Sequence, residues 1–332
     1  MIPGIEHWAL GIENESPPSP RGGGCRGGSA PSAPIPSGGG GGIHSQFSML
    51  NARFLPALAA CLTAVGCGTY SPLDSPYNRG VEYYDQGRLV EAVEAYRQAV
   101  DDDPGDVRAH FNLGVAYHDL GRLEEAEAAY ARVLDLRPRN ARARINLASL
   151  RLDQQRPDEA KALLEEAAGL DGDTALPHVA LGAFHERRGD ATAALSAYLR
   201  GVDADPRDAA AHGGVARLKA RAGDHVAAVE SYDRALASRP DDVASLIGSS
   251  EAREKVGDLV PATLHLERAL VHARDRADLW LRLANLYERL DRPEDAVAAL
   301  WEARAREPSN PEIAPRLKRL YARLAEKEGP GR

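Results

Sequence analysis

The chain has 332 residues and a formal net charge of −8, with 43% hydrophobic but only 5% aromatic residues. This mild acidity gives no support for nucleic-acid binding, which favours a basic stripe, so no nucleic-acid partner is expected. The three cysteines, Cys25, Cys61 and Cys67, all precede residue 68, which excludes a disulfide framework or a cysteine metal site in the remainder of the chain.

Residues 1–48 are rich in Gly, Pro and Ser and show neither helical nor strand periodicity. Such a segment cannot bury enough apolar surface to offset its chain entropy. Two interpretations are open. Either 1–48 is a disordered extension, or translation begins at Met49 and the segment is mis-annotated. We favour the second because of the pattern that follows Met49.

Residues 49–66 have the features of an export signal. A short start with one positive charge leads to the 12-residue apolar run 54–65, and Gly66 and Cys67 follow. A charged start, an apolar run of this length and a small-residue cleavage site are typical of a signal peptide, and the run is too short to span a membrane. Because the pattern ends on cysteine, it resembles a bacterial lipoprotein signal, in which the cysteine is lipidated and becomes the mature N-terminus.

This resemblance implies that Cys67 is lipidated and that 67–72 is a lipidated cysteine with a short tether. Cys61 is the alternative, because residues 58–60 fit the Leu-small-small-Cys box of such signals better. Against Cys61, its apolar run would be only seven residues. In these lipoproteins an aspartate after the cysteine retains the protein in the inner membrane, so Gly68 implies the outer membrane, with the chain facing the periplasm.

Residues 73–310 repeat with a period of 34, without insertion or deletion. In 107–140, two short helical patterns meet at Gly121, and Pro138 ends the second. A glycine at that turn suits the left-handed backbone that ends a helix. The turn glycine recurs as Gly87, Gly121, Gly189, Gly223 and Gly257, and an alanine of the second helix recurs as Ala92, Ala126, Ala160, Ala194, Ala228, Ala262 and Ala296.

This order of small, aromatic and proline positions resembles the tetratricopeptide repeat, whose 34-residue unit is a helix–turn–helix. The resemblance implies an all-α solenoid, a right-handed superhelix of seven units whose first helices line a concave groove for a protein or extended peptide. Small residues such as Gly114 and Gly182 would let the two helices of a unit approach closely. The units are 73–106, 107–140, 141–174, 175–208, 209–242, 243–276 and 277–310, followed by a capping helix at 311–325 and a frayed tail at 326–332.

Two units depart from the pattern. The third has Gln155 in place of the turn glycine, and the sixth has Ser249 and Ser250 where its helices cross, so the sixth unit is expected to be the least stable. Pro157 and Pro293 are expected in the first turn of their second helices, where a missing N–H donor costs nothing.

Motifs for catalysis are missing from the sequence: it has no Gly-rich phosphate loop, no HExxH and no Gly-x-Ser-x-Gly. His110, His178 and His212 share one place in three units, which indicates repeat geometry. His265 and His272 lie seven residues apart without a third ligand nearby in sequence. We therefore expect no enzyme activity, no cofactor, no metal and no small-molecule substrate.

Asn78, Asn112 and Asn146 occupy the same place in the first three units, on the face expected to line the groove. Asparagine is an indifferent helix former, and its amide can pair with both the N–H and the C=O of an extended peptide. In tetratricopeptide arrays that bind long peptides, such a ladder holds the backbone of the partner. The alternative is that these asparagines cap or solvate their own helices. Helix propensity alone predicts that alanine at these positions leaves stability unchanged.

Arg108 and Arg142 lie beside the asparagines and complete the predicted peptide-binding residues. Further arginines close in sequence suggest a basic patch that pairs with carboxylates of a partner. The alternative is a solvated face balanced by nearby glutamates. The further arginines are Arg137, Arg139, Arg144 and Arg151, and the glutamates are Glu124, Glu125 and Glu127.

The sequence thus predicts a non-catalytic scaffold, anchored to a membrane by its lipid, that binds a protein or peptide in the groove. It resembles the outer-membrane tetratricopeptide lipoproteins that help to assemble secretins for type IV pili or that dock cell-wall enzymes, and these specific roles rest on analogy. The alternatives are a soluble cytoplasmic adaptor and, more distantly, an enzyme.

Overall fold

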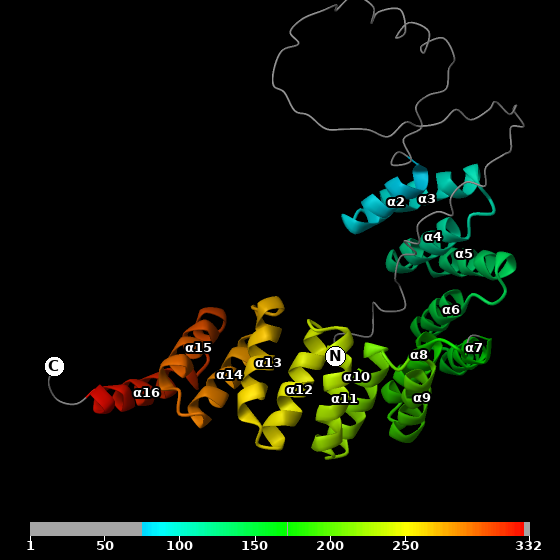
Figure 1. Ribbon diagram of the computed structural model, residues 1–332. Helices are drawn as coiled ribbons and strands as arrows, with labels where there is room; N and C mark the ends of the chain where they lie inside the picture. The colour runs from blue at the N-terminus through cyan, green and yellow to red at the C-terminus, as the bar shows by residue number, and fades with distance from the viewer. Residues whose placement is uncertain (1–74, 171, 329–332) are drawn as a thin grey trace, which may run out of the picture.

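The structure, a computed structural model, describes residues 75–170 and 172–328 (Figure 1). The extension, signal, tether and cysteines predicted from the sequence lie outside these residues. The described part of the chain is all-α, with fifteen helices and no strand. The helices are α2 (Pro76–Asp85), α3 (Leu89–Asp102), α4 (Val107–Asp119), α5 (Leu123–Leu136), α6 (Ala141–Asp153), α7 (Pro157–Leu170), α8 (Ala175–Arg187), α9 (Ala191–Ala204), α10 (Ala209–Arg221), α11 (His225–Ser238), α12 (Val243–Lys255), α13 (Leu259–His272), α14 (Ala277–Arg289), α15 (Pro293–Arg306) and α16 (Ile313–Glu328).

The helices pack as seven consecutive pairs, and the pairs follow one another along a curve (Figure 1). The pairs α2 to α7 form one arm, and α10 to α16 form a second arm that runs in a different direction. First helices also contact one another, α4 with α6, α6 with α8, α8 with α10 and α10 with α12. The first helices therefore form the inner row of an all-α solenoid, as predicted.

Each first helix ends in a tight turn with a residue in the left-handed region. In α4 the N–H of Arg122 donates to the carbonyl of Tyr117 at 2.8 Å across Gly121, whose φ is +71°. This confirms the predicted role of the turn glycine. The third and seventh units keep the same turn without glycine, because Gln155 (φ 60°) and Asp291 (φ 56°) take the left-handed conformation themselves.

Small residues at the helix crossing are confirmed as a packing requirement. A Cβ added at Gly114 would lie 2.6 Å from the ring of Tyr130, and one at Gly182 would lie 2.7 Å from the ring of Tyr198. Each tyrosine ring therefore fills the space that a side chain on the first helix would need. Both tyrosines are almost fully buried, so the contact forms part of the core of its unit.

The two second-helix prolines lie as predicted: α7 begins at Pro157 and α15 begins at Pro293. The last helix, α16, covers the end of the array by burying Ile313, Leu317 and Leu320. It continues to Glu328, three residues beyond the end expected for the cap. None of the helices in the described residues is long and apolar enough to cross a membrane.

Candidate interaction surface

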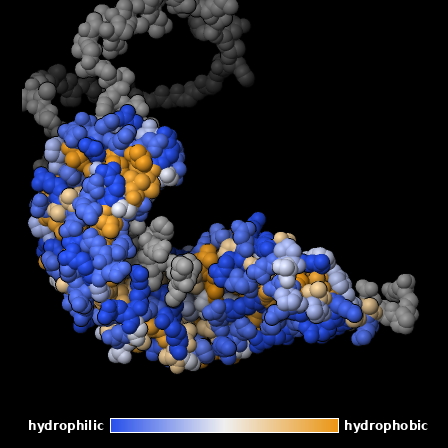
Figure 2. Space-filling view, turned by 180° about the vertical axis from the view of Figure 1, so that it is seen from behind, coloured by the Kyte–Doolittle hydropathy of each residue, from blue (hydrophilic) through white to orange (hydrophobic). Residues whose placement is uncertain are grey.

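The inner row of first helices is the surface that the sequence assigns to a partner. Figure 2 shows a hollow between the two arms and an outer surface that is mainly hydrophilic, with scattered hydrophobic patches. Side chains on the inner row come from successive units at a spacing of 34 residues, so a feature repeated in the sequence becomes a row in space.

Two of the three predicted asparagines are fully enclosed. Asn112 and Asn146 have no exposed area, and Asn78 is half-buried. The Asn112 amide donates to the hydroxyl of Tyr77 at 3.1 Å, and the Asn146 amide donates to the hydroxyl of Tyr130 at 3.4 Å. Their role in holding a peptide stays a prediction, and to fulfil it each amide would first have to release a tyrosine.

The tyrosine of the preceding unit explains the pattern at this position along the array. Burial raises the pKa of Tyr130, and the Asn146 amide partly offsets the shift. Two units later the position is glycine, because a Cβ on Gly214 would lie 2.5 Å from the ring of Tyr198. Asn146 and Gly214 are therefore matched to a tyrosine on the second helix of the unit before, whereas Asn112 contacts Tyr77 on the first helix. The period of 34 does not reveal these relationships.

Most arginines of the predicted basic patch have partners within the chain. Arg144 pairs with Glu166 at 2.8 Å, and Arg108 pairs with Asp106 at 3.6 Å. Arg151 donates to Glu127 at 2.5 and 2.8 Å, which lowers the pKa of that carboxyl. Of the glutamates in the alternative interpretation, Glu127 balances Arg151, and the role of the patch in binding a partner stays a prediction.

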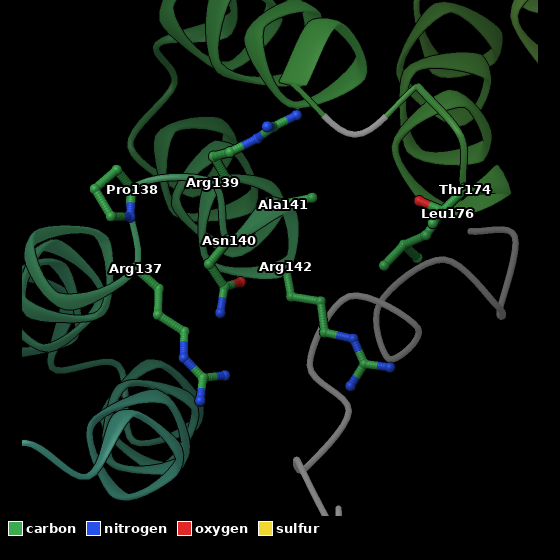
Figure 3. Close-up of a pocket in the computed structure, with 8 residues that line it drawn as sticks. All are labelled: Arg137, Pro138, Arg139, Asn140, Ala141, Arg142, Thr174 and Leu176. Atoms are coloured by element: carbon green, nitrogen blue, oxygen red, sulfur yellow. The ribbon is translucent and has the colours of Figure 1, made fainter.

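Three arginines of the patch line a cavity of about 590 Å³ at the edge of the inner row, where α6 and α8 begin (Figure 3). Arg139 is tied to the carbonyl of Leu170 at 2.7 Å. Arg137 and Arg142 make no ion pair with any described residue. Figure 3 shows them on either side of Asn140, with Arg137 in the loop before it and Arg142 in the first turn of α6. Pro138, Ala141, Thr174 and Leu176 complete the lining, in which the described residues include no carboxylate.

Four polar contacts join the last turns of neighbouring first helices, and the order of the acidic residue and its partner differs between the two arms. In the first arm the later residue of each contact is an aspartate, whereas in the second arm it is an arginine. The contacts join Tyr84 to Asp119, His118 to Asp153 (2.6 Å), Glu186 to Arg221 and Glu254 to Arg289 (2.7 Å).

The three recurring histidines serve the repeat geometry. The Nε2 atom of each donates to a backbone carbonyl six residues earlier: His110 to Pro104 at 3.1 Å, His212 to Pro206 at 3.0 Å and His178 to Gly172 at 3.4 Å. Within the described residues, no cluster of histidine, aspartate and glutamate is placed to hold a metal ion.

Comparisons with known proteins agree with this architecture. Three models of the tetratricopeptide repeat match, one at 77–141 and 179–243, a second at 121–183 and a third at 277–324. No curated protein sequence matches the chain.

Three solved structures illustrate the likeness. A chain of the APC/C hetero-tetramer Cut9–Hcn1 has a TM-score of 0.55 at 19% identity over 76% of this chain, which spans only 49% of that larger chain. PilF of Pseudomonas aeruginosa has a TM-score of 0.54 at 16% identity, over 65% of this chain and 97% of its own. PilW, described as a type IV pilus biogenesis factor, has a TM-score of 0.50 at 18% identity, over 65% of this chain and 98% of its own.

At these identities the solved structures show a shared fold alone. The family models together span most of 77–324, and the helix pairs, turns and crossings described above have the same period of 34. The chain belongs to the tetratricopeptide repeat family.

Proposed function

We propose that this chain is a non-catalytic scaffold that binds a protein or an extended peptide along its inner row of first helices. The observation that carries the proposal is the continuous inner row of first helices, which contact one another from α4 to α12. The arginine-lined cavity at the edge of that row adds a candidate contact site. A repeat array offers a long surface and a small core, an architecture suited to recognition.

The predicted peptide-binding residues contribute unequally in this proposal. Arg142 is exposed and Arg108 is half-buried, so both can reach a partner from the surface. Asn78 is half-buried near the start of the inner row. Asn112 and Asn146 form the floor, where they hold tyrosine hydroxyls and would contact a peptide only after a local rearrangement.

The proposal also includes anchoring. Lipidation at Cys67 would tether the first unit close to a membrane, with the array in the periplasm and the anchor in the outer membrane. Its support is the export-signal pattern in 49–66 and the cysteine that ends it. A type IV pilus biogenesis factor among proteins of the same fold is compatible with a role in assembling an envelope complex, although likeness at this identity carries the fold alone.

Palmitate labelling of the expressed full chain tests the anchor. We expect label on the unaltered chain and on Cys61→Ser, and loss of the label in Cys67→Ser, with the labelled chain recovered in the outer-membrane fraction. Label that is lost only in Cys61→Ser would keep the anchor but move its site. An unlabelled chain in the cytoplasm would contradict the anchor and support the adaptor alternative.

A further inference from the structure

The segment that connects the second and third units differs in charge from the other connections of the array. Residues 137–142 read RPRNAR, with three arginines and no acidic residue. Every other connection at the same register has at least one acidic residue. These connections read DPGDVR at 103–108, DGDTAL at 171–176, DPRDAA at 205–210, RPDDVA at 239–244, ARDRAD at 273–278 and EPSNPE at 307–312.

The residue that caps the helix after this connection is neutral, although an aspartate caps the corresponding helix in neighbouring units. Asp208 caps α10 by accepting from the N–H of Ala211 at 2.7 Å, and Asp106 caps α4 in the same way. In α6 the cap is Asn140, which accepts from the N–H of Ala143 at 2.9 Å. Aspartate and asparagine are equally good caps, so helix formation does not explain why the carboxylate is missing here.

The neutral cap has a consequence for the arginine two residues later. In the second unit, Arg108 pairs with the cap Asp106 at 3.6 Å, and its guanidinium lies over the ring of Tyr77. Arg142 stands at the same register in the third unit, but Asn140 offers it no carboxylate. Arg142 is exposed and makes no ion pair with a described residue, so its guanidinium stays available to a ligand.

The surroundings of Arg142 favour an anion. Arg137 lies on the other side of Asn140 and is also without an ion pair in the described part of the chain. The cavity of about 590 Å³ exceeds the size of one carboxylate, and none of the described residues that line it is acidic. The N-terminus of α6 adds the partial positive charge of the helix dipole. An anion in the cavity would therefore meet two guanidinium groups and a helix N-terminus.

We propose that this cavity binds carboxylate groups of an acidic segment of the protein partner, with Arg137 and Arg142 as their ligands. This inference rests on the proposed scaffold function and names the chemistry of its partner. Guanidinium groups match carboxylates through paired hydrogen bonds. The apolar side chains of Pro138 and Leu176 in the lining suit the methylene groups of a glutamate. A nucleic acid is disfavoured because the net charge of −8 repels a long polyanion.

Binding of a fluorescent hexaglutamate peptide with an amidated C-terminus, measured by anisotropy on the purified full chain, tests the site. Arg137→Gln with Arg142→Gln should weaken binding by roughly tenfold for each arginine lost. Asn140→Asp should weaken it by a similar factor while keeping the cap, because the new carboxylate would occupy Arg142 as Asp106 occupies Arg108. Arg97→Gln with Arg234→Gln removes the same charge from exposed second-helix positions and should leave the affinity unchanged.

Equal affinity in all variants would overturn the site, because the two arginines would then make no contribution. Equal loss of affinity in the Arg97 and Arg234 control would also overturn it, because the effect would then come from net charge. Hexaglutamine with a free C-terminus carries a terminal carboxylate but no side-chain carboxylates. If it bound as tightly as hexaglutamate, the site would not recognise an acidic segment. Binding to vesicles containing phosphatidylglycerol that is lost in the Arg137 and Arg142 double variant would also contradict the proposed acidic segment, because the lipid anchor is common to both proteins. A partner captured equally well by the Arg137 and Arg142 double variant would refute this site and leave the scaffold proposal standing.

Discussion

The side-chain amide of Asn112 donates a hydrogen bond to the hydroxyl of Tyr77, 35 residues earlier and one unit back in the array. Asn146 also donates across the boundary between two units, to the hydroxyl of Tyr130 on the second helix of the unit before. Neither amide has exposed area, so each bond lies inside the contact that holds neighbouring units together. In a repeat array such contacts supply much of the stability, because each unit touches only its neighbours.

Replacing Asn112 and Asn146 with alanine should therefore lower the free energy of unfolding. Asn146→Ala leaves the buried hydroxyl of Tyr130 without its donor, at a cost of about 1–3 kcal/mol, and Asn112→Ala removes a part-buried hydrogen bond worth about 0.5–1.5 kcal/mol. This exceeds the few tenths of a kcal/mol that alanine gains as a helix former, so the expectation from helix propensity alone is reversed. Urea denaturation followed by circular dichroism measures the difference.

Asn285→Ala is the matched control, because this asparagine lies exposed on α14 and its loss should change stability by less than about 0.5 kcal/mol. A double variant that unfolds at the same urea concentration as the unaltered chain, yet no longer captures a partner, would contradict the structural role and favour direct contact with a peptide.

The fold could be predicted from the sequence because the period of 34 marks every helix pair and turn. The period could not explain the residue type at positions whose side chains contact the preceding unit. The spacing of Asn112 and Asn146 suggested a ladder for a ligand, whereas the neighbouring tyrosines supply an internal partner for both amides. Gln155 was recognised as a departure, but its left-handed backbone was not predicted, because few non-glycine residues adopt it.

Two adjacent serines in the sixth unit should respond in opposite ways to alanine. Both are fully buried, but Ser249 Oγ shares a hydrogen bond of 2.9 Å with His265 Nδ1, whereas Ser250 Oγ has no partner among the described residues. Ser250→Ala removes an unpaired buried hydroxyl and should raise stability by about 1 kcal/mol, while Ser249→Ala should lower it by about the same amount. Thermal and urea unfolding of the two variants provide the measurement. A destabilising effect of Ser250→Ala would contradict the assignment of an unpaired hydroxyl to Ser250.

Hydrogen exchange should be faster in 243–276 than in 107–140. The sixth unit has two buried serines where its helices cross, and its second helix packs with Leu266 where the second unit has Tyr130. Local opening in a repeat array follows the weakest nearest-neighbour contacts. Mass-spectrometric exchange on the full chain compares the two segments directly, and equal protection would show that the departures of the sixth unit have no energetic effect.

His265 should make the chain less stable in mild acid. Burial, followed by the charge of Arg253, lowers the pKa of His265 from its ordinary value of 6.5, against the opposing effect of Asp233. Between 6.5 and the lowered pKa, the unfolded chain binds a proton that the folded chain does not, so stability falls as pH falls through this window.

Unfolding curves at pH 7 and pH 5.5 for the unaltered chain and for His265→Gln check this sign. The variant should lose less stability over that interval, because glutamine does not titrate and the remaining carboxylates and histidines are common to both proteins. A larger acid loss in the variant would mean that the charged form of His265 is favoured in the fold.

The candidate site could be predicted only in part, for a similar reason. Charge in the sequence drew attention to the arginines near the third unit, and Arg137 and Arg142 were among them. Which arginines remain available depends on carboxylates that approach from other helices, such as Glu166 toward Arg144. The sequence also gave no sign that Arg137 would join Arg142 in one cavity.

Site-specific photo-crosslinking in cells that express the full chain tests the central claim most directly. A photoreactive residue replaces Leu176 or Asn285 on first helices, or Arg97 or Arg234 on second helices, one at a time. The scaffold account predicts adducts with a partner protein from the first-helix positions and none from the second-helix positions. Adducts that form only from Arg97 and Arg234, or equally from all four positions, would contradict binding along the inner row.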